Sequence, residues 1–231
     1  MQIVVLDYGS GNVRSAVRAL ELVGARLVAD ETSPITELRV TLTADRSLAT
    51  GADGLVVPGV GAFAACMAGL NAVAAQQILA ERLAAGRKVL GICVGMQVLF
   101  TDGVEHGVRT PGLGLLPGTV ELLRAPVIPH MGWNTVTPPA DSVLMAGVEA
   151  DTRFYFVHSY AVRPPTPGTH YRGSYSPLSG FTFATTEHGE PFVSAVESPS
   201  LSATQFHPEK SGAAGQALLA NWIHSISQGE S

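Results

Sequence analysis

The feature that most constrains this chain is a cysteine between two glycines, directly after an apolar run. Val89–Ile92 is predicted to be a strand, and Cys93 follows it with Gly91 and Gly95 two residues away on either side. This spacing predicts a sharp strand-to-helix turn of the nucleophile-elbow type, with cysteine in place of serine. Side chains at the glycine positions would collide with neighbouring backbone, and the central residue is held in a strained conformation. We therefore expect the Cys93 thiol to be presented at the start of a helix.

That position also suits the chemistry of a thiol. The free N–H groups and positive dipole end of a helix favour thiolate, which is the reactive form, and the amide of Val94 can point at an oxyanion. The other cysteine, Cys66, lies between small and apolar residues of a predicted helix, so we interpret it as structural. Cys93 is therefore the candidate nucleophile.

A parallel sheet is predicted by β-branched runs that alternate with helical stretches in the N-terminal half. Strands are expected at Ile3–Leu6 and Leu55–Val57, and helices at Asn12–Val23, ended by Gly24, and at Ala62–Ala85, ended by Gly86. The expected fold class is α/β, a three-layer sandwich with a mostly parallel central sheet and a smaller antiparallel strand region. One domain is expected to span residues 1–231.

The C-terminal half has a different texture. After about residue 115, Val, Thr and aromatic runs divided by Pro and Gly predict short, partly antiparallel strands. The stretch 163–180 is rich in Pro, Gly, Ser and Thr and is expected to be a surface loop or hairpin excursion. Ser202–Phe206 is predicted to be a strand and Ser211–Ser227 the final helix.

Composition excludes several classes of function. The chain has 231 residues, 46% of them hydrophobic, which is enough for a sizeable core. Charged residues make up only 14%, the formal net charge is -5, and no Lys or Arg run occurs. We therefore expect no nucleic acid or membrane partner, and a small neutral or zwitterionic substrate. The opening Met1–Asp7 has neither a basic region nor a long apolar run, which predicts a cytoplasmic protein. The scattered histidines predict no metal site.

A base for the thiol is predicted at His207–Pro208–Glu209, after the Ser202–Phe206 strand. Proline drives His207 into an extended conformation, in which residues i and i+2 project to the same side. Glu209 could then fix one ring nitrogen while the other exchanges a proton with Cys93. A polar surface turn is the alternative for this tetrapeptide. Among the other histidines only His188 has a carboxylate at this spacing, across Gly189 in a predicted hairpin turn; His106, His130, His158, His170 and His224 are expected to be structural or surface residues.

The segment Val56–Phe63 follows a strand and opens a helix, so its amides near Val60 and Gly61 are candidate oxyanion donors. The same letters fit the dinucleotide fingerprint G-x-G-x-x-A, which would place a pyrophosphate here. That rival requires an acidic residue about 20 positions on, at a strand end. Glu81 is the residue at that distance, and it falls inside a predicted helix. Gly9–Asn12 is a further phosphate-like turn, which we interpret as a helix-capping turn.

Taken together, these motifs resemble the class I, or triad, glutamine amidotransferases. The sequence is most similar to their family of glutaminase subunits of imidazole glycerol phosphate synthase, from residue 3 to about 225. The elbow and His207–Glu209 carry the resemblance to the class. The narrower resemblance is carried by five segments: Asp7–Asn12, Pro58–Phe63, Pro129–Asn134, Phe156–Tyr160 and Gln205–Ser211. Departures are small, with Val94 where Leu is commoner and a loop between Val162 and Phe181 that is longer than usual.

The resemblance implies a role for each matching residue. Cys93, His207 and Glu209 would be the catalytic triad, and Val60, Gly61 and Val94 the oxyanion hole. Glutamine would be bound by Gly61, Gln97, Glu105, Ser159 and Tyr160. Trp133, Tyr155 and Lys210 would face a (β/α)8 barrel cyclase, the partner in a heterodimer. No cofactor is implied. The ammonia from L-glutamine would be used by the cyclase to make imidazole glycerol phosphate and aminoimidazole carboxamide ribotide in histidine biosynthesis.

Two alternatives stay open at this point. One is the amidotransferase subunit of another complex, such as pyridoxal phosphate synthase or anthranilate synthase. The other belongs to a different class, a non-catalytic regulatory or dinucleotide-binding module built on the same sheet. Labelling of Cys93 by an electrophilic glutamine analogue separates the second from an enzyme, because only an activated thiol reacts.

Overall fold

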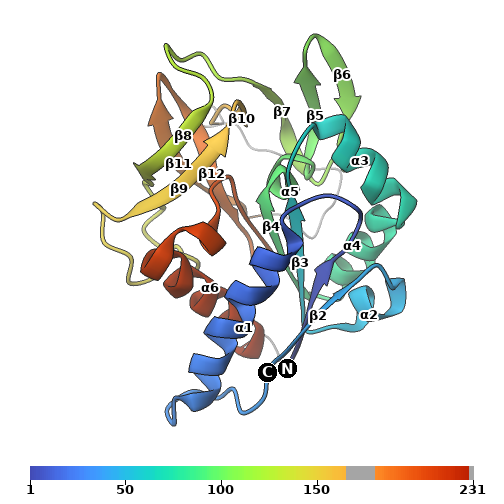
Figure 1. The fold of residues 1–231 in the computed structure, drawn as a ribbon, viewed down its shortest axis with the longest axis vertical. Coiled ribbons are helices and arrows are strands. Elements are labelled where there is room, and N and C mark those ends of the chain that lie inside the picture. Colours follow the sequence, from blue (N-terminus) through green and yellow to red (C-terminus); the bar gives the residue numbers. More distant parts are fainter. Residues whose placement is uncertain (165–179, 229–231) are drawn as a thin grey trace.

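A seven-stranded sheet forms the centre of the structure (Figure 1), a computed structural model that describes residues 1–164 and 180–228. Five neighbouring strands run parallel, and two antiparallel strands extend one edge. The predicted loop at 163–180 falls almost entirely outside the described residues. In spatial order the strands are β11 (Thr182–His188), β12 (Glu190–Glu197), β13 (Leu201–Thr204), β4 (Lys88–Cys93), β3 (Gly54–Gly59), β1 (Gln2–Leu6) and β2 (Arg39–Thr43).

Helices cover both faces of this sheet. On one side lie α1 (Val13–Ala29) and α6 (Gly212–Ser227), and on the other α2 (Arg46–Gly51), α3 (Phe63–Ala72) and α4 (Ala75–Ala84) (Figure 1). Strands β3 and β4 carry almost continuous buried apolar runs, as expected of parallel strands covered on both faces. The predicted fold class, a three-layer α/β sandwich with a mostly parallel sheet, is confirmed.

Two smaller sheets make up the predicted antiparallel region. One has the order β10 (Tyr160–Val162), β7 (Leu116–Leu122), β5 (Phe100–Glu105) and β6 (Val108–Pro111), and the other pairs β8 (His130–Thr135) with β9 (Arg153–His158). All of these pairs are antiparallel except β5 with β7. The predicted hairpin turn at Gly189 is also confirmed: this residue, with a φ of +73°, connects the antiparallel strands β11 and β12.

Two predicted helix boundaries are wrong. Gly24 does not end α1: it is buried inside the helix, where a Cβ would lie 2.7 Å from the Leu38 side chain. The helix runs on to Ala29, and the carboxylate of the next residue, Asp30, accepts from the amide of Thr32 in the turn that follows. The stretch predicted as one helix, Ala62–Ala85, is two helices joined through Ala74 in a left-handed conformation.

No proline or glycine in the sequence indicates the break between α3 and α4, which lies at Val73 and Ala74. A left-handed alanine costs roughly 1–2 kcal/mol, so packing of the two helices imposes it. In the described part of the chain no single helix has the length and apolar character to cross a membrane; α3 and α4 meet these criteria only as a pair, bent by 76°.

The order of the strands places the functional residues. In the parallel register Gly59 pairs with Cys93, and Thr204 pairs with Ile92, so β3, β4 and β13 end at one edge of the sheet. Segments far apart in the sequence therefore meet there: the loop before α3, the turn after β4, and the 3-10 turn Pro208–Lys210 after β13. The carboxyl edge of a parallel sheet is where ligands bind in α/β folds.

Candidate functional site

The turn after β4 is strained in the way the glycine spacing predicts. Cys93 has φ +57° and ψ -115°, a conformation that side chains rarely adopt, and α5 (Val94–Gln97) starts at the next residue. A Cβ on Gly95 would lie 1.8 Å from the carbonyl oxygen of Val57, and one on Gly91 would lie 2.8 Å from the carbonyl oxygen of Gly95. The predicted need for both glycines is confirmed.

The helix after the turn is shorter than the predicted activation of the thiol by a helix N-terminus requires. Helix α5 has only four residues, so few peptide dipoles are aligned behind Cys93. The activation of the thiol that was expected from a helix N-terminus is correspondingly weak. Activation therefore has to come mainly from neighbouring side chains.

His207 is the neighbour that can supply it. Its Nδ1 lies 2.7 Å from Glu209 Oε1, and both side chains are buried. The predicted extended conformation is found for His207, with φ -101° and ψ 97°, but Pro208–Lys210 curls into a 3-10 turn, and that turn brings the carboxylate back to the ring. The His207 backbone is held as well, because its N–H donates to the Tyr155 carbonyl and its own carbonyl accepts from the Ser211 hydroxyl.

The second ring nitrogen of His207 is the one available for chemistry. Nε2 is buried and has no hydrogen-bond partner among the described residues. Cys93 lines the same cavity as His207 and interacts with its ring, although no hydrogen bond to Nε2 is formed. Burial lowers the pKa of His207, but interaction with Cys93 and with Glu209 outweighs burial and raises the pKa to about 9. The imidazole is therefore adapted to accept and hold a proton next to the thiol.

A cavity of about 240 Å³ collects most of the residues predicted for the site. It is lined by the loop before α3, the elbow, one β5 carboxylate, the strand ends at 157–160 and the turn after β13. The lining residues are Val60, Gly61, Cys93, Val94, Gln97, Glu105, Val157, His158, Ser159, Tyr160, His207 and Lys210. Glu209 lies behind His207 rather than in the wall.

Gln97 in the cavity wall and the buried Gln205 behind it connect the wall to the thiol. Gln97 Nε2 donates to the Tyr160 carbonyl at 2.8 Å and to Gln205 Oε1 at 3.0 Å, while Gln205 Nε2 lies 3.8 Å from Cys93 Sγ. Gln205 is only 1% exposed. No role was predicted for it, because an uncharged polar residue two positions before His207 is too weak a local signal to indicate one. Glu105 contacts the Phe63 amide, at the start of α3, with one of its oxygens.

The loop predicted to supply oxyanion donors contacts the turn after β1. The Val60 carbonyl accepts from the Ser10 hydroxyl at 2.8 Å and lies 3.4 Å from Cys66 Sγ. Gly61 has φ +90°, so this position needs glycine. The Gly9–Asn12 turn thus packs on the loop; Asn12 does precede α1, but its side chain makes no capping hydrogen bond.

The positions of Gly59 and Glu81 do not support the alternative of a dinucleotide-binding site. A Cβ on Gly59 would lie 2.5 Å from the Gly95 amide nitrogen, so this glycine is needed for packing against the elbow. Glu81, the only acidic residue at the required distance, lies in α4 and pairs with Arg46 on the surface at 2.5 Å. It is therefore not at a strand end, where a ribose would bind.

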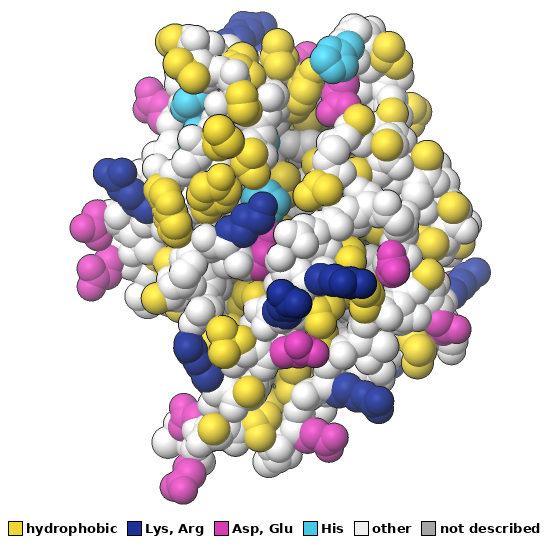
Figure 2. Space-filling view, viewed as in Figure 1, with side chains coloured by type: hydrophobic (Ala, Val, Ile, Leu, Met, Phe, Trp, Pro, Cys, Tyr) yellow, Lys and Arg dark blue, Asp and Glu magenta, His cyan; other side chains and the backbone are white. Residues whose placement is uncertain are grey.

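The three residues predicted to face a partner form one patch. The Trp133 and Tyr155 rings are in edge-to-face contact with centroids 5.9 Å apart, and Lys210 Nζ lies 5.9 Å from the Tyr155 centroid. Trp133 is 52% and Met131 66% exposed, although both are large and apolar. Figure 2 shows hydrophobic side chains gathered over β8 and β9 on this face, with a histidine and a basic side chain beside them. Exposed apolar clusters of this kind mark interaction surfaces.

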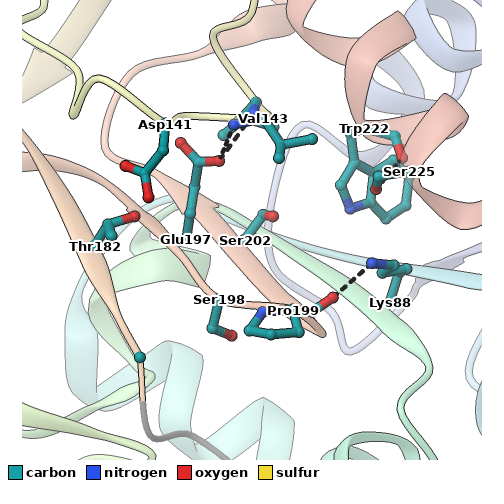
Figure 3. A pocket seen from close by; sticks show the side chains of 12 residues that line it. Lys88, Asp141, Val143, Thr182, Glu197, Ser198, Pro199, Ser202, Trp222 and Ser225 are labelled. Carbon is teal, nitrogen blue, oxygen red and sulfur yellow. Dashed lines mark hydrogen bonds between the residues drawn. The ribbon is translucent and has the colours of Figure 1, made fainter. Parts of the chain in front are cut away.

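A second cavity has a volume of about 250 Å³, and Figure 3 shows the residues that line it. It lies at the end of β4 opposite to Cys93. Lys88 lines it at the start of β4, which places it roughly 16 Å along the strand from Cys93. Its polar groups are largely satisfied within the chain: Glu197 accepts from the amides of Val143 and Leu144, and Lys88 Nζ donates to the Pro199 carbonyl. Among the described residues that line it there is no cysteine or histidine, and it is separate from the cavity that contains Cys93.

Comparison with known proteins identifies the class. Residues 4–226 match the glutamine amidotransferase class-I family, and the chain belongs to that family. The glutaminase domain of Trypanosoma brucei CTPS has the same fold, with a TM-score of 0.64, 18% identity, and coverage of 99% of this chain and 94% of that one.

Closer relatives narrow the assignment. The imidazole glycerol phosphate synthase subunit HisH of Nocardia farcinica is 58% identical over 97% of this chain and 98% of that protein. The subunit HisH of Thermobifida fusca is 56% identical over 97% of this chain and 99% of that protein. Within class I, the chain belongs to the family of these HisH subunits.

Proposed function

We propose that this chain is the glutaminase subunit of imidazole glycerol phosphate synthase. It hydrolyses L-glutamine to glutamate and ammonia, and a cyclase partner uses the ammonia to make imidazole glycerol phosphate and aminoimidazole carboxamide ribotide in histidine biosynthesis. The observation that carries the proposal is a strained, buried Cys93 that shares one cavity with His207, whose ring is bonded to Glu209 behind it. Identity of 58% to a HisH subunit over nearly the whole chain supports the choice of reaction.

In the proposed mechanism, Cys93 loses its proton to His207 Nε2 and its sulfur attacks the carboxamide carbon of glutamine. The amides of Val94 and of the Val60–Gly61 loop stabilise the oxyanion. His207 then returns the proton to the leaving nitrogen, the C–N bond breaks, and ammonia leaves a thioester on Cys93. Water, activated by the same imidazole, hydrolyses the thioester to glutamate and restores the thiol. Glu209 stabilises the imidazolium in both half-reactions.

Substrate binding is assigned to the rest of the cavity wall. Glu105 provides a negative charge for the ammonium of glutamine, with its second oxygen free of the contact to Phe63. Gly61, Ser159 and Tyr160 supply backbone and hydroxyl groups around the amino-acid moiety, and Gln97 orders the wall through its hydrogen bond to the Tyr160 carbonyl. The cavity volume of about 240 Å³ suits a small substrate such as one amino acid.

The partner is assigned to the patch around Trp133, Tyr155 and Lys210. We propose that a (β/α)8 barrel cyclase docks there to form a heterodimer in the cytoplasm. Lys210 lines the cavity as well as the patch, so the patch borders the place where ammonia is released. Ammonia has to stay out of bulk water to remain an uncharged nucleophile, which is a physical reason for closing the site with a second subunit.

Glutamine-dependent formation of imidazole glycerol phosphate, with the cognate cyclase present, tests the proposal. We expect little glutamate from the isolated chain, strong stimulation by the substrate-loaded cyclase, and no turnover for Cys93→Ala. Glu209→Gln should lower kcat by about 10²- to 10⁴-fold, the range typical of general acid–base catalysis, whereas Glu149→Gln on the surface should not change it. Added ammonium salt should restore product in the Cys93→Ala complex, because it bypasses this site.

A glutamine-analogue electrophile provides an independent check. Mass spectrometry should find one adduct, on Cys93, because Cys66 is buried beside Ser10 and burial raises the pKa of its thiol. An adduct on Cys66 alone, or wild-type complex that forms product from ammonium but not from glutamine, would contradict the assignment.

A further inference from the structure

Three histidines outside the proposed triad lie together on the inner side of β8. His130 and His158 are buried, with His130 Nδ1 3.1 Å from His158 Nε2. The His188 ring stacks on His130 at 4.2 Å and its Nε2 contacts the Val127 carbonyl. None of these three histidines transfers a proton in the proposed reaction.

The rings of His130 and His158 are neutral at pH 7. Burial, with a smaller effect from His188, lowers the pKa of His130 to about 4. Burial also lowers the pKa of His158 to about 3, with further lowering by His130, His188 and His207 against the opposing hydrogen bond to Tyr160. Each ring therefore carries one hydrogen and offers one donor and one acceptor.

The neighbours of the two rings fix which nitrogen carries that hydrogen. Asn134 Oδ1 accepts from the Thr135 amide and its Nδ2 donates to the Glu187 carbonyl, which settles the orientation of this amide. Nδ2 then also donates to His130 Nε2 at 3.2 Å. His130 must carry its hydrogen on Nδ1 and donate to His158 Nε2, which leaves His158 Nδ1–H to donate to the Tyr160 carbonyl at 3.0 Å. The hydrogen bonds form a chain with one direction.

One end of this hydrogen-bond chain lies in the wall of the cavity, and the other lies on strand β8. The Tyr160 carbonyl is also the acceptor for Gln97, so it is held from two sides in the wall of the cavity that contains Cys93. At the other end, β8 alternates: His130 and Asn134 point inward, while Met131 and Trp133 point outward and are exposed. The chain therefore starts on the strand that carries the partner patch.

We propose that His130 and His158 are positioning residues that, through this directed hydrogen-bond chain from Asn134, fix the Tyr160 carbonyl and thereby the glutamine-binding wall. The inference rests on the proposed function, because glutamine is the ligand whose binding would change. It assigns a role to β8 beyond docking, since a partner that contacts the outer face of this strand lies over the residues that start the chain.

Two variants of His158 separate its two contacts. The amide of asparagine can reach the position of Nδ1 and donate to Tyr160, but it loses the contact to His130; the amide of glutamine can reach the position of Nε2 and keep His130, but it loses Tyr160. In the complex with the cyclase we expect His158→Gln to raise the KM for glutamine by about 2- to 10-fold with kcat nearly unchanged, the effect of one hydrogen bond. His158→Asn should stay closer to wild type. Equal KM values for both variants, whether raised or unchanged, would overturn the role of the Tyr160 contact.

Tautomers are measured separately by ¹⁵N NMR of histidine-labelled chain at neutral pH. His130 and His158 should both show a protonated Nδ1 and an unprotonated Nε2, and an Nε2–H tautomer at His158 would refute the chain. This measurement does not depend on activity. If the wild-type complex failed to use glutamine while both tautomers were as stated, the proposed function would fail and the hydrogen-bond chain would stand.

Discussion

Gly95→Ala is the sharpest test of how the elbow is built. The added Cβ would lie 1.8 Å from the Val57 carbonyl oxygen, whereas real Cβ atoms essentially never come closer than 3.0 Å to such an atom. Either β3 or the elbow must therefore move by about 1 Å. The Val57 oxygen is a backbone atom and the position of a Cβ is fixed by its own backbone, so in this buried layer no side chain can rotate to absorb the overlap.

The expected magnitudes follow from that displacement. Overpacking of a core typically costs 1–3 kcal/mol, and we expect about 3 kcal/mol here because the clash is with backbone. A misplacement of about 1 Å at a reacting group lowers turnover by about 10²-fold, so glutamine-dependent activity should fall by at least that much.

Gly51→Ala is the matched control. Gly51 ends α2 with a negative φ, and a Cβ there would meet nothing within 4 Å. It should keep full activity and be neutral or stabilised by up to about 1 kcal/mol. Urea unfolding gives the stabilities, and glutamate release in the cyclase complex gives the activities. A Gly95→Ala protein with the stability and turnover of the Gly51→Ala control would refute the steric explanation.

Three further predictions concern other parts of the molecule. Arg82 is fully buried and donates to five backbone carbonyls. Arg82→Met should therefore lower the free energy of unfolding, measured in urea titrations, by about 3 kcal/mol or more. The control Arg18→Met, on the exposed face of α1, should lower it by less than about 0.5 kcal/mol. Because the pKa of His207 is raised from 6.5 to about 9, its protonation stabilises the fold fully below pH 6.5 and less as the pH rises through 9. The stability of wild type relative to His207→Gln should therefore fall by about 3 kcal/mol between about pH 6 and pH 10, and a pH-independent difference would contradict the shift. Trp133→Ala should weaken cyclase binding by about 2 kcal/mol or more in calorimetric titration, whereas Leu22→Ala, at a comparably exposed residue on α1, should leave binding unchanged.

Local sequence was sufficient where geometry is set within a few residues. The elbow at Cys93 follows from its two glycines, and the hairpin at Gly189 from a residue free to adopt positive φ. The alternation of strands and helices predicted the parallel sheet, because side-chain periodicity is a property of the segment itself. The helix boundaries at Gly24 and Ala74 failed because each depends on a distant contact: Gly24 makes room for Leu38, and Ala74 accepts strain that packing imposes.

The candidate site shows the same division. Cys93 and the His207–Glu209 pair could be selected from sequence, since each is marked by its immediate neighbours. The roles of Gln205, His130 and His158 could not, because a buried polar residue has no local signature and its partner is chosen by the tertiary fold. Even the His207–Glu209 contact depends on a 3-10 turn rather than on the extended chain that was expected.

The amino-acid sequence by itself determined the kind of fold, the position of the strained cysteine and the residues able to serve as its base, because backbone conformation and side-chain chemistry at those points are local properties. Only the tertiary structure decided that strands β3, β4 and β13 end side by side, so that Gly61, Cys93 and His207 share one cavity. The order of strands in a sheet depends on how whole faces are buried against helices. That is a property of the folded chain as a whole, and no short segment contains it.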